Sequence, residues 1–233
     1  MTSTVRRAPV SEDVFRRLCE EILSGRYAPG EKLPTQRRLA ASLGVNLASI
    51  REAVKRLEQL RLVEVRQGDA MRVTRWQSEA GLDVIVHVLL AGGALDRETL
   101  SEVLEARRWM LSKAAGLAAE RRSPEQAAAL EDVARKLAGA KDLEAAQALD
   151  FAFFSLVVEA SGNLVFGLIM NSIRRLYFEH AELFRDVVGD PEALPLYHEA
   201  ATAMVAGEPV KAAEAVERIA EGQEARLGPD ASN

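Results

Sequence analysis

The sequence contains a single cysteine, Cys19, among 233 residues. One cysteine cannot form an internal disulfide, and a thiolate metal cluster would need more sulfur ligands. No uncharged apolar run reaches the ~20 residues that cross a bilayer, so we expect no membrane partner. The first residues form no apolar signal segment, and a lone thiol suits a reducing compartment, so we expect a cytoplasmic protein.

The sequence also lacks the motifs of common enzyme classes. We find no nucleophile elbow, no phosphate-binding glycine loop, no paired catalytic carboxylates and no metal-ligand cluster. We therefore expect a binding protein without a cofactor rather than an enzyme.

The net charge of −5 is divided unevenly along the chain. Residues 1–76 hold 15 Lys and Arg against 9 Asp and Glu, a net charge of +6, whereas the remaining 15 basic and 26 acidic residues give −11. A basic segment attracts phosphates and an acidic one is repelled by them. We therefore expect the amino-terminal part to face nucleic acid.

Residues 33–60 have the pattern of two helices joined by a tight turn. Gly44 can end the first helix in a left-handed conformation, and Asn46 can cap the second. Helical spacing predicts that the second helix buries Ile50, Val54 and Leu57. The opposite face is small and basic, with Leu47, Ala48, Arg51 and Lys55. Such a helix after a sharp turn is the shape that enters a major groove, so DNA binding is our leading hypothesis.

A β-hairpin is predicted directly after these helices. Leu62–Arg66 and Met71–Thr74 alternate inward and outward around a tip at residues 67–70. A first helix is expected over residues 11–24. These elements predict a winged helix-turn-helix DNA-binding domain over residues 8–75.

The rest of the chain shows helical patterns and no convincing strand. Glycine and proline clusters separate the helices that we expect over residues 79–91, 97–121, 124–138, 141–160, 163–187, 191–206 and 208–226. Ligand sites in helical bundles commonly lie between facing helices. The predicted fold class is therefore mainly α, with an all-α effector-binding and dimerisation domain over residues 76–228.

Both parts resemble a known family. The run ILSGRYAPGEKLP, followed by RRLAASLGV and IREAVKRLEQLRLVEV, resembles the winged-helix module of GntR-type bacterial transcription regulators. The run DFAFFSLVVEASGNLVFGLIMNSIRRLY, followed by LYHEA, resembles the effector domain of the FadR subgroup, most closely its fatty-acid-metabolism branch. The hinge segment RWQSEAGLDVI is also similar to that branch.

The resemblance implies a set of DNA-binding residues. The family reads its operator with basic and small polar residues on the second and third helices and with the wing tip. The matching residues here are Arg37, Arg38, Asn46, Leu47, Ala48, Ser49, Arg51, Gln67 and Gly68. Leu47 replaces an arginine that the family usually has, and Gln67 replaces a histidine of the branch. Because Leu47 can touch a thymine methyl but cannot hydrogen-bond a base, we expect an operator unlike the usual one.

The resemblance also indicates which residues would be the ligands of a metal ion. Many relatives hold a metal with one aspartate and three histidines, of which this chain keeps Asp150 and His198. Phe154 and Ile219 stand at the other two positions, so we expect no bound metal. Asp150 and His198 either hydrogen-bond each other, contact a ligand or have a structural role.

An apolar effector is the alternative that the aromatic residues favour. Six of the seven phenylalanines lie from Phe151 to Phe184, either as ordinary core or as the lining of a cavity. The branch that this chain resembles senses long-chain acyl-CoA, and Arg107 matches an arginine that often faces the ligand. The expected effector-binding residues are Arg107, Asp150, Phe154, Asn163, Tyr177 and His198. Ile219 and Leu227 replace a tyrosine and a tryptophan of the branch.

These observations predict a homodimeric transcription regulator that binds a palindromic operator in double-stranded DNA, with acyl-CoA weakening that binding. Two alternatives stay open. The same architecture could sense a small organic acid through Arg107, Asp150 and His198, or the protein could bind a ligand without specific DNA recognition.

Overall fold

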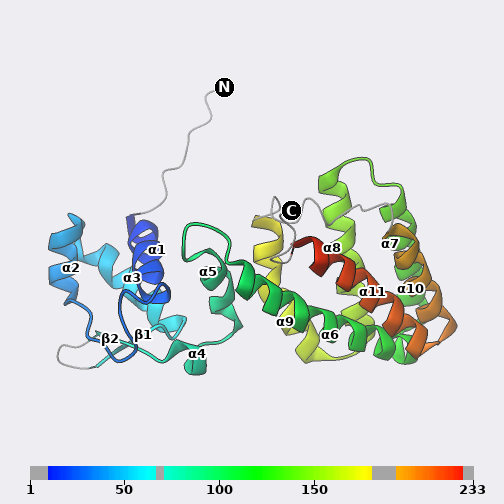
Figure 1. The fold of residues 1–233 in the computed structure, drawn as a ribbon, viewed down its shortest axis with the longest axis horizontal. Helices are drawn as coiled ribbons and strands as arrows, with labels where there is room; N and C mark the ends of the chain where they lie inside the picture. The colour runs from blue at the N-terminus through cyan, green and yellow to red at the C-terminus, as the bar shows by residue number, and fades with distance from the viewer. Residues whose placement is uncertain (1–9, 67–70, 180–192, 228–233) are drawn as a thin grey trace. The chain divides into compact units, whose positions relative to one another are not determined.

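The computed structural model describes residues 10–66, 71–179 and 193–227. The chain divides into two compact units, Met1–Asp96 and Arg97–Asn233, called here the N-terminal and C-terminal units. Helices dominate both units, and the strands among the described residues form one two-stranded sheet in the N-terminal unit (Figure 1). This confirms the predicted mainly α fold with a small hairpin.

The N-terminal unit begins with three helices and a hairpin. Its elements are α1 (Val10–Leu23), α2 (Gln36–Leu43), α3 (Leu47–Gln59), β1 (Val63–Val65) and β2 (Met71–Val73). The strands pair antiparallel, with Val63 opposite Val73 and Val65 opposite Met71. The hairpin therefore has the register that its alternating sequence predicts.

Local capping determines where α2 ends and α3 begins. Gly44 has a φ of 64°, a left-handed conformation that glycine adopts without the strain of a Cβ atom. The Oδ1 atom of Asn46 then accepts a hydrogen bond from the N–H of Ser49 at 2.8 Å. The turn predicted from Gly44 and Asn46 is confirmed, with Asn46 as the cap of α3.

The apolar stripes of α1 and α3 form the core of this unit. Phe15, Leu18 and Ile22 of α1 are buried with Ile50 and Leu57 of α3 in one cluster. Helical spacing places each set on one side of its helix, so the two stripes meet when the helices pack. Burial of these side chains leaves the opposite face of α3 outside the core.

The segment after the hairpin differs from the prediction of one helix over residues 79–91. The structure has α4 (Trp76–Glu79), the 3-10 helix η1 (Leu82–Val84) and α5 (Ile85–Leu90). Ala80 and Gly81 are extended, with ψ of 161° and −174°, so helical hydrogen bonds cannot continue through them. Val84 is buried in the core of the N-terminal unit. This unit therefore extends to Asp96, beyond the expected boundary after residue 75.

The C-terminal unit is a helical bundle. Its described helices are α6 (Arg97–Arg121), α7 (Pro124–Ala138), α8 (Leu143–Ala160), α9 (Leu164–Glu179), α10 (Leu194–Ala206) and α11 (Pro209–Leu227). These helices begin within a few residues of the predicted positions. The part of the predicted fifth helix beyond residue 179 lies outside the described residues. Among the described residues, every helix is too short or too polar to cross a bilayer.

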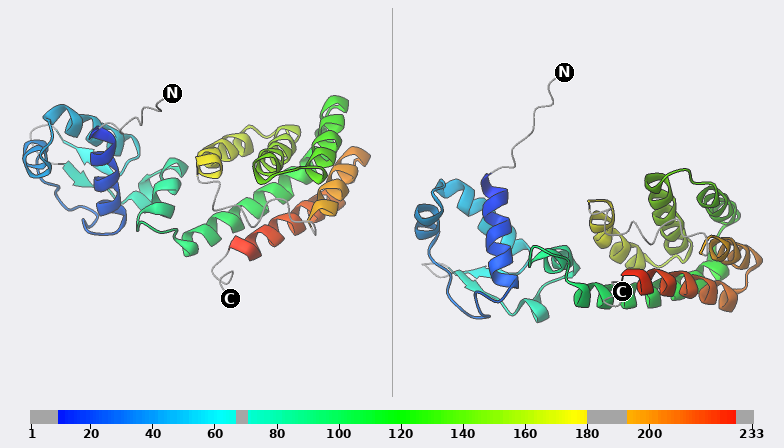
Figure 2. Two further views of the ribbon diagram at one scale, coloured as in Figure 1. Left: turned by 90° about the horizontal axis from the view of Figure 1, so that it is seen from above. Right: turned by 45° about the horizontal axis from the view of Figure 1, so that its top comes forward.

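Small side chains let α6 and α11 pack closely. The two helices run antiparallel and side by side (Figure 2), and Ala115, Ala118 and Ala215 are fully buried. A Cβ atom added to Gly116 would lie 3.3 Å from the carbonyl oxygen of Pro209. Alanine and glycine at these positions therefore set the distance between the two helix backbones.

Candidate functional site

Four cationic side chains lie on the surfaces of α2 and α3. Arg37 and Arg38 are exposed in the first turn of α2, and Arg51 and Lys55 are exposed on α3. Within the described part of the chain, none of these four side chains forms an ion pair with a carboxylate. Their positive charges are therefore available to an external anion.

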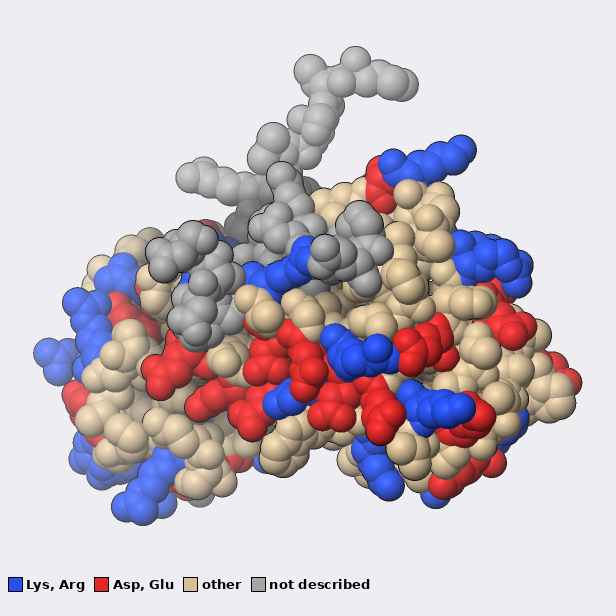
Figure 3. Space-filling view, turned by 45° about the vertical axis from the view of Figure 1, so that its right-hand side comes forward, with Lys and Arg blue, Asp and Glu red and all other residues tan. Residues whose placement is uncertain are grey.

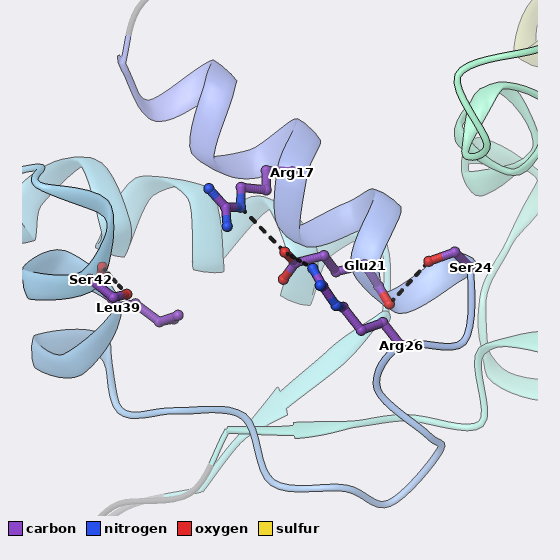
Figure 4. Close-up of polar contacts among 6 residues, drawn as sticks. All are labelled: Arg17, Glu21, Ser24, Arg26, Leu39 and Ser42. Atoms are coloured by element: carbon purple, nitrogen blue, oxygen red, sulfur yellow. Dashed lines mark hydrogen bonds and ion pairs between the residues drawn. The ribbon is translucent and has the colours of Figure 1, made fainter.

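The arginines around α1 contrast with these four. Arg17 and Arg26 both donate to the Oε1 atom of Glu21, at 3.3 and 2.8 Å (Figure 4). Arg56 donates to Glu12. Basic and acidic side chains also stand next to each other over much of the face drawn in Figure 3. Neutralised surface charge is thus common in this protein, and within the described residues Arg37, Arg38, Arg51 and Lys55 depart from it.

The other predicted DNA-binding residues have different environments. Asn46 uses its Oδ1 atom to cap α3, Ala48 is exposed, and Ser49 is half-buried. Leu47 is half-exposed and is not among the partly buried apolar side chains that pack on the core. The wing-tip predictions, Gln67 and Gly68, lie outside the described residues.

Asp150 is the centre of a buried hydrogen-bond network in the C-terminal unit. Its carboxylate accepts hydrogen bonds from the hydroxyl of Tyr177 at 2.6 Å and from the hydroxyl of Tyr197. The Nε2 atom of Gln223 donates to Asp150 at 3.1 Å and to the Tyr197 hydroxyl at 3.2 Å. One carboxylate of α8 thus joins side chains from α9, α10 and α11.

Arg107 of α6 adds a positive charge to this network. Its Nη1 atom donates to the Oε1 atom of Gln223 at 2.8 Å, and its guanidinium carbon lies 4.7 Å from the centre of the Phe154 ring. A guanidinium has five N–H donors, and this hydrogen bond uses one of them. Among the described residues Arg107 therefore keeps N–H donors that could bind an anionic group.

The two tyrosines are donors at any neutral pH. Burial, followed by the charge of Asp150, raises the pKa of both Tyr177 and Tyr197 well above the usual value. Both hydroxyls therefore stay protonated and keep their hydrogen bonds to the carboxylate.

The described residues around Asp150 offer few ligand atoms to a metal ion. Among the described residues Asp150 is the one carboxylate of the network, and it already accepts two tyrosine hydroxyl protons and one amide N–H. Phe154 and Ile219 are both buried and supply no ligand atoms. Among the described residues, no three His, Cys, Asp or Glu side chains are grouped so that they could hold a metal.

Two predicted effector residues lie away from the network. His198 is exposed on α10, so the hypothesised hydrogen bond between Asp150 and His198 is wrong. Tyr197, one position earlier on the helix, is on the buried side and takes that place. Asn163 caps α9, because its Oδ1 atom accepts from the N–H groups of Val165 and Phe166.

Sequence reasoning missed Tyr197 and Gln223. The signal for Gln223 was its spacing of four residues from Ile219, which puts both on one face of α11. The signal for Tyr197 was weaker, since two polar aromatic residues stand side by side and only the rotation of α10 decides which one is buried.

The aromatic side chains of α8 pack as core. The rings of Phe153 and Tyr197 lie 5.1 Å apart and those of Phe151 and Tyr177 lie 5.3 Å apart, centre to centre. Phe178 is exposed, and Phe184 lies outside the described residues. The rings of Phe151, Phe153, Phe154 and Phe178 thus contact each other or the two tyrosines of the network.

Two protein families match the two units. Residues 10–73 match the bacterial regulatory proteins of the gntR family, and residues 102–222 match the FCD domain. The first match contains Arg37, Arg38, Arg51 and Lys55, which have no carboxylate partner among the described residues, and the second contains Arg107, Asp150 and both tyrosines.

Curated relatives span most of the chain. The transcriptional regulator Mce2R of Mycobacterium tuberculosis is 38% identical over 93% of this chain and 91% of its own length. The regulator LutR of Bacillus subtilis is 30% identical over 68% of this chain and 71% of its own. A fatty acid metabolism regulator protein of Klebsiella pneumoniae is 28% identical over 82% and 79%. This last relative supports the resemblance to the FadR subgroup.

A solved structure shares the fold. The Listeria monocytogenes protein Lar superposes with a TM-score of 0.59 at 15% identity, covering 97% of this chain and 98% of its own. The curated relatives are transcriptional regulators and not enzymes. The chain therefore belongs to the GntR family of bacterial regulatory proteins, as a transcription regulator whose C-terminal unit is an FCD effector domain.

Proposed function

We propose that this regulator binds a palindromic operator as a homodimer and releases it when a long-chain acyl-CoA binds the C-terminal unit. The observation that carries the DNA part is the absence of carboxylate partners, within the described residues, for Arg37, Arg38, Arg51 and Lys55. A guanidinium can grip a phosphate or a guanine edge with two hydrogen bonds. A two-fold dimer would present these cations twice, which matches a two-fold site.

The effector part is supported by the mixture of charge and apolar surface around Arg107. An acyl-CoA combines phosphates with a long apolar chain, and the site combines one cation with the rings of Phe151, Phe154 and Tyr177. Each methylene buried there would contribute ~0.8 kcal/mol. The Klebsiella relative, a regulator of fatty acid metabolism by name, supports the same ligand class.

The packed aromatic rings suggest how the ligand would act. An acyl chain entering between α8 and α9 has to separate Phe151 from Tyr177, whose ring centres are 5.3 Å apart. The ligand would therefore bind a rearranged bundle better than the packed one, and such differential binding is what shifts an equilibrium. A 100-fold loss of operator affinity requires ~2.7 kcal/mol of coupling between the two sites.

The test is a titration of operator affinity with palmitoyl-CoA. The operator is first obtained by selection from genomic fragments, and no enriched sequence would favour a ligand-binding protein without specific DNA recognition. We expect palmitoyl-CoA to weaken operator binding by the wild type and to have little effect on Arg107→Gln. Arg135→Gln is the matched control, because Arg135 is exposed on α7 and pairs only with Asp132 among the described residues.

A small organic acid is the second candidate, favoured by the polar side of the site. Among the described residues Arg107 has N–H donors to spare, and Tyr177, Tyr197 and Gln223 could exchange partners with a ligand carboxylate. Thermal-shift titrations with lactate, citrate, malonate and palmitoyl-CoA distinguish the two candidate effectors, a small organic acid and an acyl-CoA. Stabilisation by one of the acids alone would reject acyl-CoA.

A further inference from the structure

Trp109 is the largest apolar side chain that the C-terminal unit leaves in solvent among the described residues. It lies on α6, and its side chain is 64% exposed, whereas its neighbours Met110 and Leu111 are buried. An indole is costly to hydrate and is enriched at the energetic centres of protein interfaces. The position of Trp109 is therefore better explained by a partner than by the fold of one chain.

A hollow lies beside Trp109, between α6 and α11. It has a volume of about 640 Å³, and small residues, Ser112, Gly116 and Ala213, form part of its lining. Gly116 cannot be enlarged without meeting the Pro209 carbonyl oxygen at 3.3 Å. The short side chains that bring the two helices together thus also leave this groove open.

The groove also carries charges of both signs. Lys113 lines it from α6, and Glu214 and Glu217 line it from α11. Val210, 67% exposed, adds a second apolar side chain at the start of α11. The same surface therefore offers a projecting apolar group, a hollow, a cation and anions.

We infer that a second copy of this chain occupies the groove, with the indole of Trp109 of each chain in the hollow of the other. A two-fold interface opposes one surface to itself, so every feature must find its complement within that surface. Trp109 complements the hollow, and Lys113 complements Glu214, because Glu217 already contacts Arg108 within its own chain at 3.8 Å. The inference rests on the homodimer of the proposed function and names its interface.

The groove is too small to be the whole dimer interface. Eleven residues line it, whereas a stable interface takes roughly 20 to 30 residues a side. The contact must therefore continue along α6 and α11. We expect Trp109 to act as the anchor within this larger contact.

The experiment measures self-association of the full chain by analytical ultracentrifugation. Trp109→Glu should raise the dimer dissociation constant by at least about 30-fold. Leu164→Glu is the matched control, because Leu164 is 77% exposed on α9 and lies outside the groove. Lys113→Glu should weaken the dimer as well, and adding Glu214→Lys should restore part of the loss.

Fluorescence gives an independent readout, because the chain has two tryptophans, Trp76 and Trp109. In Trp76→Phe the remaining indole should shift to shorter emission wavelengths as dimers form. A dimer that forms without this shift, or that survives in Trp109→Glu but not in Leu164→Glu, would overturn the inference and leave the homodimer intact. A shift caused by palmitoyl-CoA without association would make the groove a ligand site and overturn it too. A chain that is monomeric at all concentrations and on DNA would refute the homodimer itself.

Discussion

Arg51 and Arg17 are both exposed arginines on helices of the N-terminal unit, and they differ in their partners. Arg17 donates to Glu21, whereas Arg51 meets no carboxylate within the described residues. A paired arginine must break its ion pair before it can bind a phosphate, but a free one need not. At this scale the local partner, rather than the residue type, identifies the candidate DNA contacts.

Arg51→Ala should therefore weaken operator binding by at least ~1 kcal/mol, about fivefold, because it removes a cation that we propose to contact the DNA. Fluorescence anisotropy with a labelled operator at physiological salt measures the change. Arg17→Ala serves as the control and should stay within about twofold. Equal losses in the two variants would reject the assignment of Arg51.

Leu47 is the residue that distinguishes this chain at the start of α3. Its side chain is half-exposed and does not pack on the core, and the thymine methyl is the apolar group of the major groove. If Leu47 covers such a methyl, replacing that thymine by uracil should weaken binding about fourfold, or ~0.8 kcal/mol. Leu47→Ala should bind the two operators equally well. Sensitivity to uracil that persists in the variant would assign the contact to another residue.

At the scale of single elements, two glycines allow the same substitution to be tested in opposite environments. Gly44 ends α2 with φ of 64°, while Gly222 lies inside α11 in an ordinary helical conformation, and neither would place a new Cβ near another atom. Gly44→Ala should lower the free energy of unfolding by about 1 kcal/mol, because a Cβ atom strains the left-handed backbone. Gly222→Ala should raise it by up to about 1 kcal/mol.

Urea unfolding followed by circular dichroism measures both glycine variants. The wild-type transitions of the two units provide the reference. Changes of the same sign would contradict the assigned backbone conformations, because the chemical change is identical in the two variants.

The individual helices also show how much of the fold can be predicted from the sequence. Gly44 at the end of α2, Asn46 at the start of α3 and the bounds of α6 and α7 were predicted because they depend on neighbours within a few residues. The predicted helix over residues 79–91 was wrong because Ala80 and Gly81 are extended and Val84 packs into the core of the N-terminal unit. Such a break depends on a long-range contact, and the helical pattern of the segment carries no trace of it.

At the scale of the whole molecule, the buried thiol of Cys19 and the buried hydroxyls of Tyr177 and Tyr197 predict that the protein loses stability at alkaline pH. Burial raises the pKa of the Cys19 thiol from 9.0 to about 12, so the unfolded chain loses this proton at lower pH than the folded protein. Between these values unfolding releases a proton, and the free energy of unfolding falls by up to about 1.4 kcal/mol for each pH unit. Tyr177 and Tyr197, also raised, act in the same direction at higher pH.

Denaturant unfolding at several pH values from 8 to 11 checks this prediction. Cys19→Ala should flatten the decline of the transition that belongs to the N-terminal unit, while the decline of the C-terminal unit persists because its tyrosines remain. An unchanged slope in the variant would show that the Cys19 thiol does not control the alkaline decline.

The sequence alone determined that this chain joins a basic helix-turn-helix to an acidic helical bundle. Periodicity, caps and charge act between near neighbours, so the order of residues is sufficient to reveal them. Only the tertiary structure decided which side chains meet. It placed Tyr197 rather than His198 beside Asp150, brought Arg107 to Gln223, and left Arg51 without a carboxylate among the described residues. The physical reason is that burial and pairing depend on the rotation of each helix against its neighbours, and one position along a helix turns a side chain by about 100°.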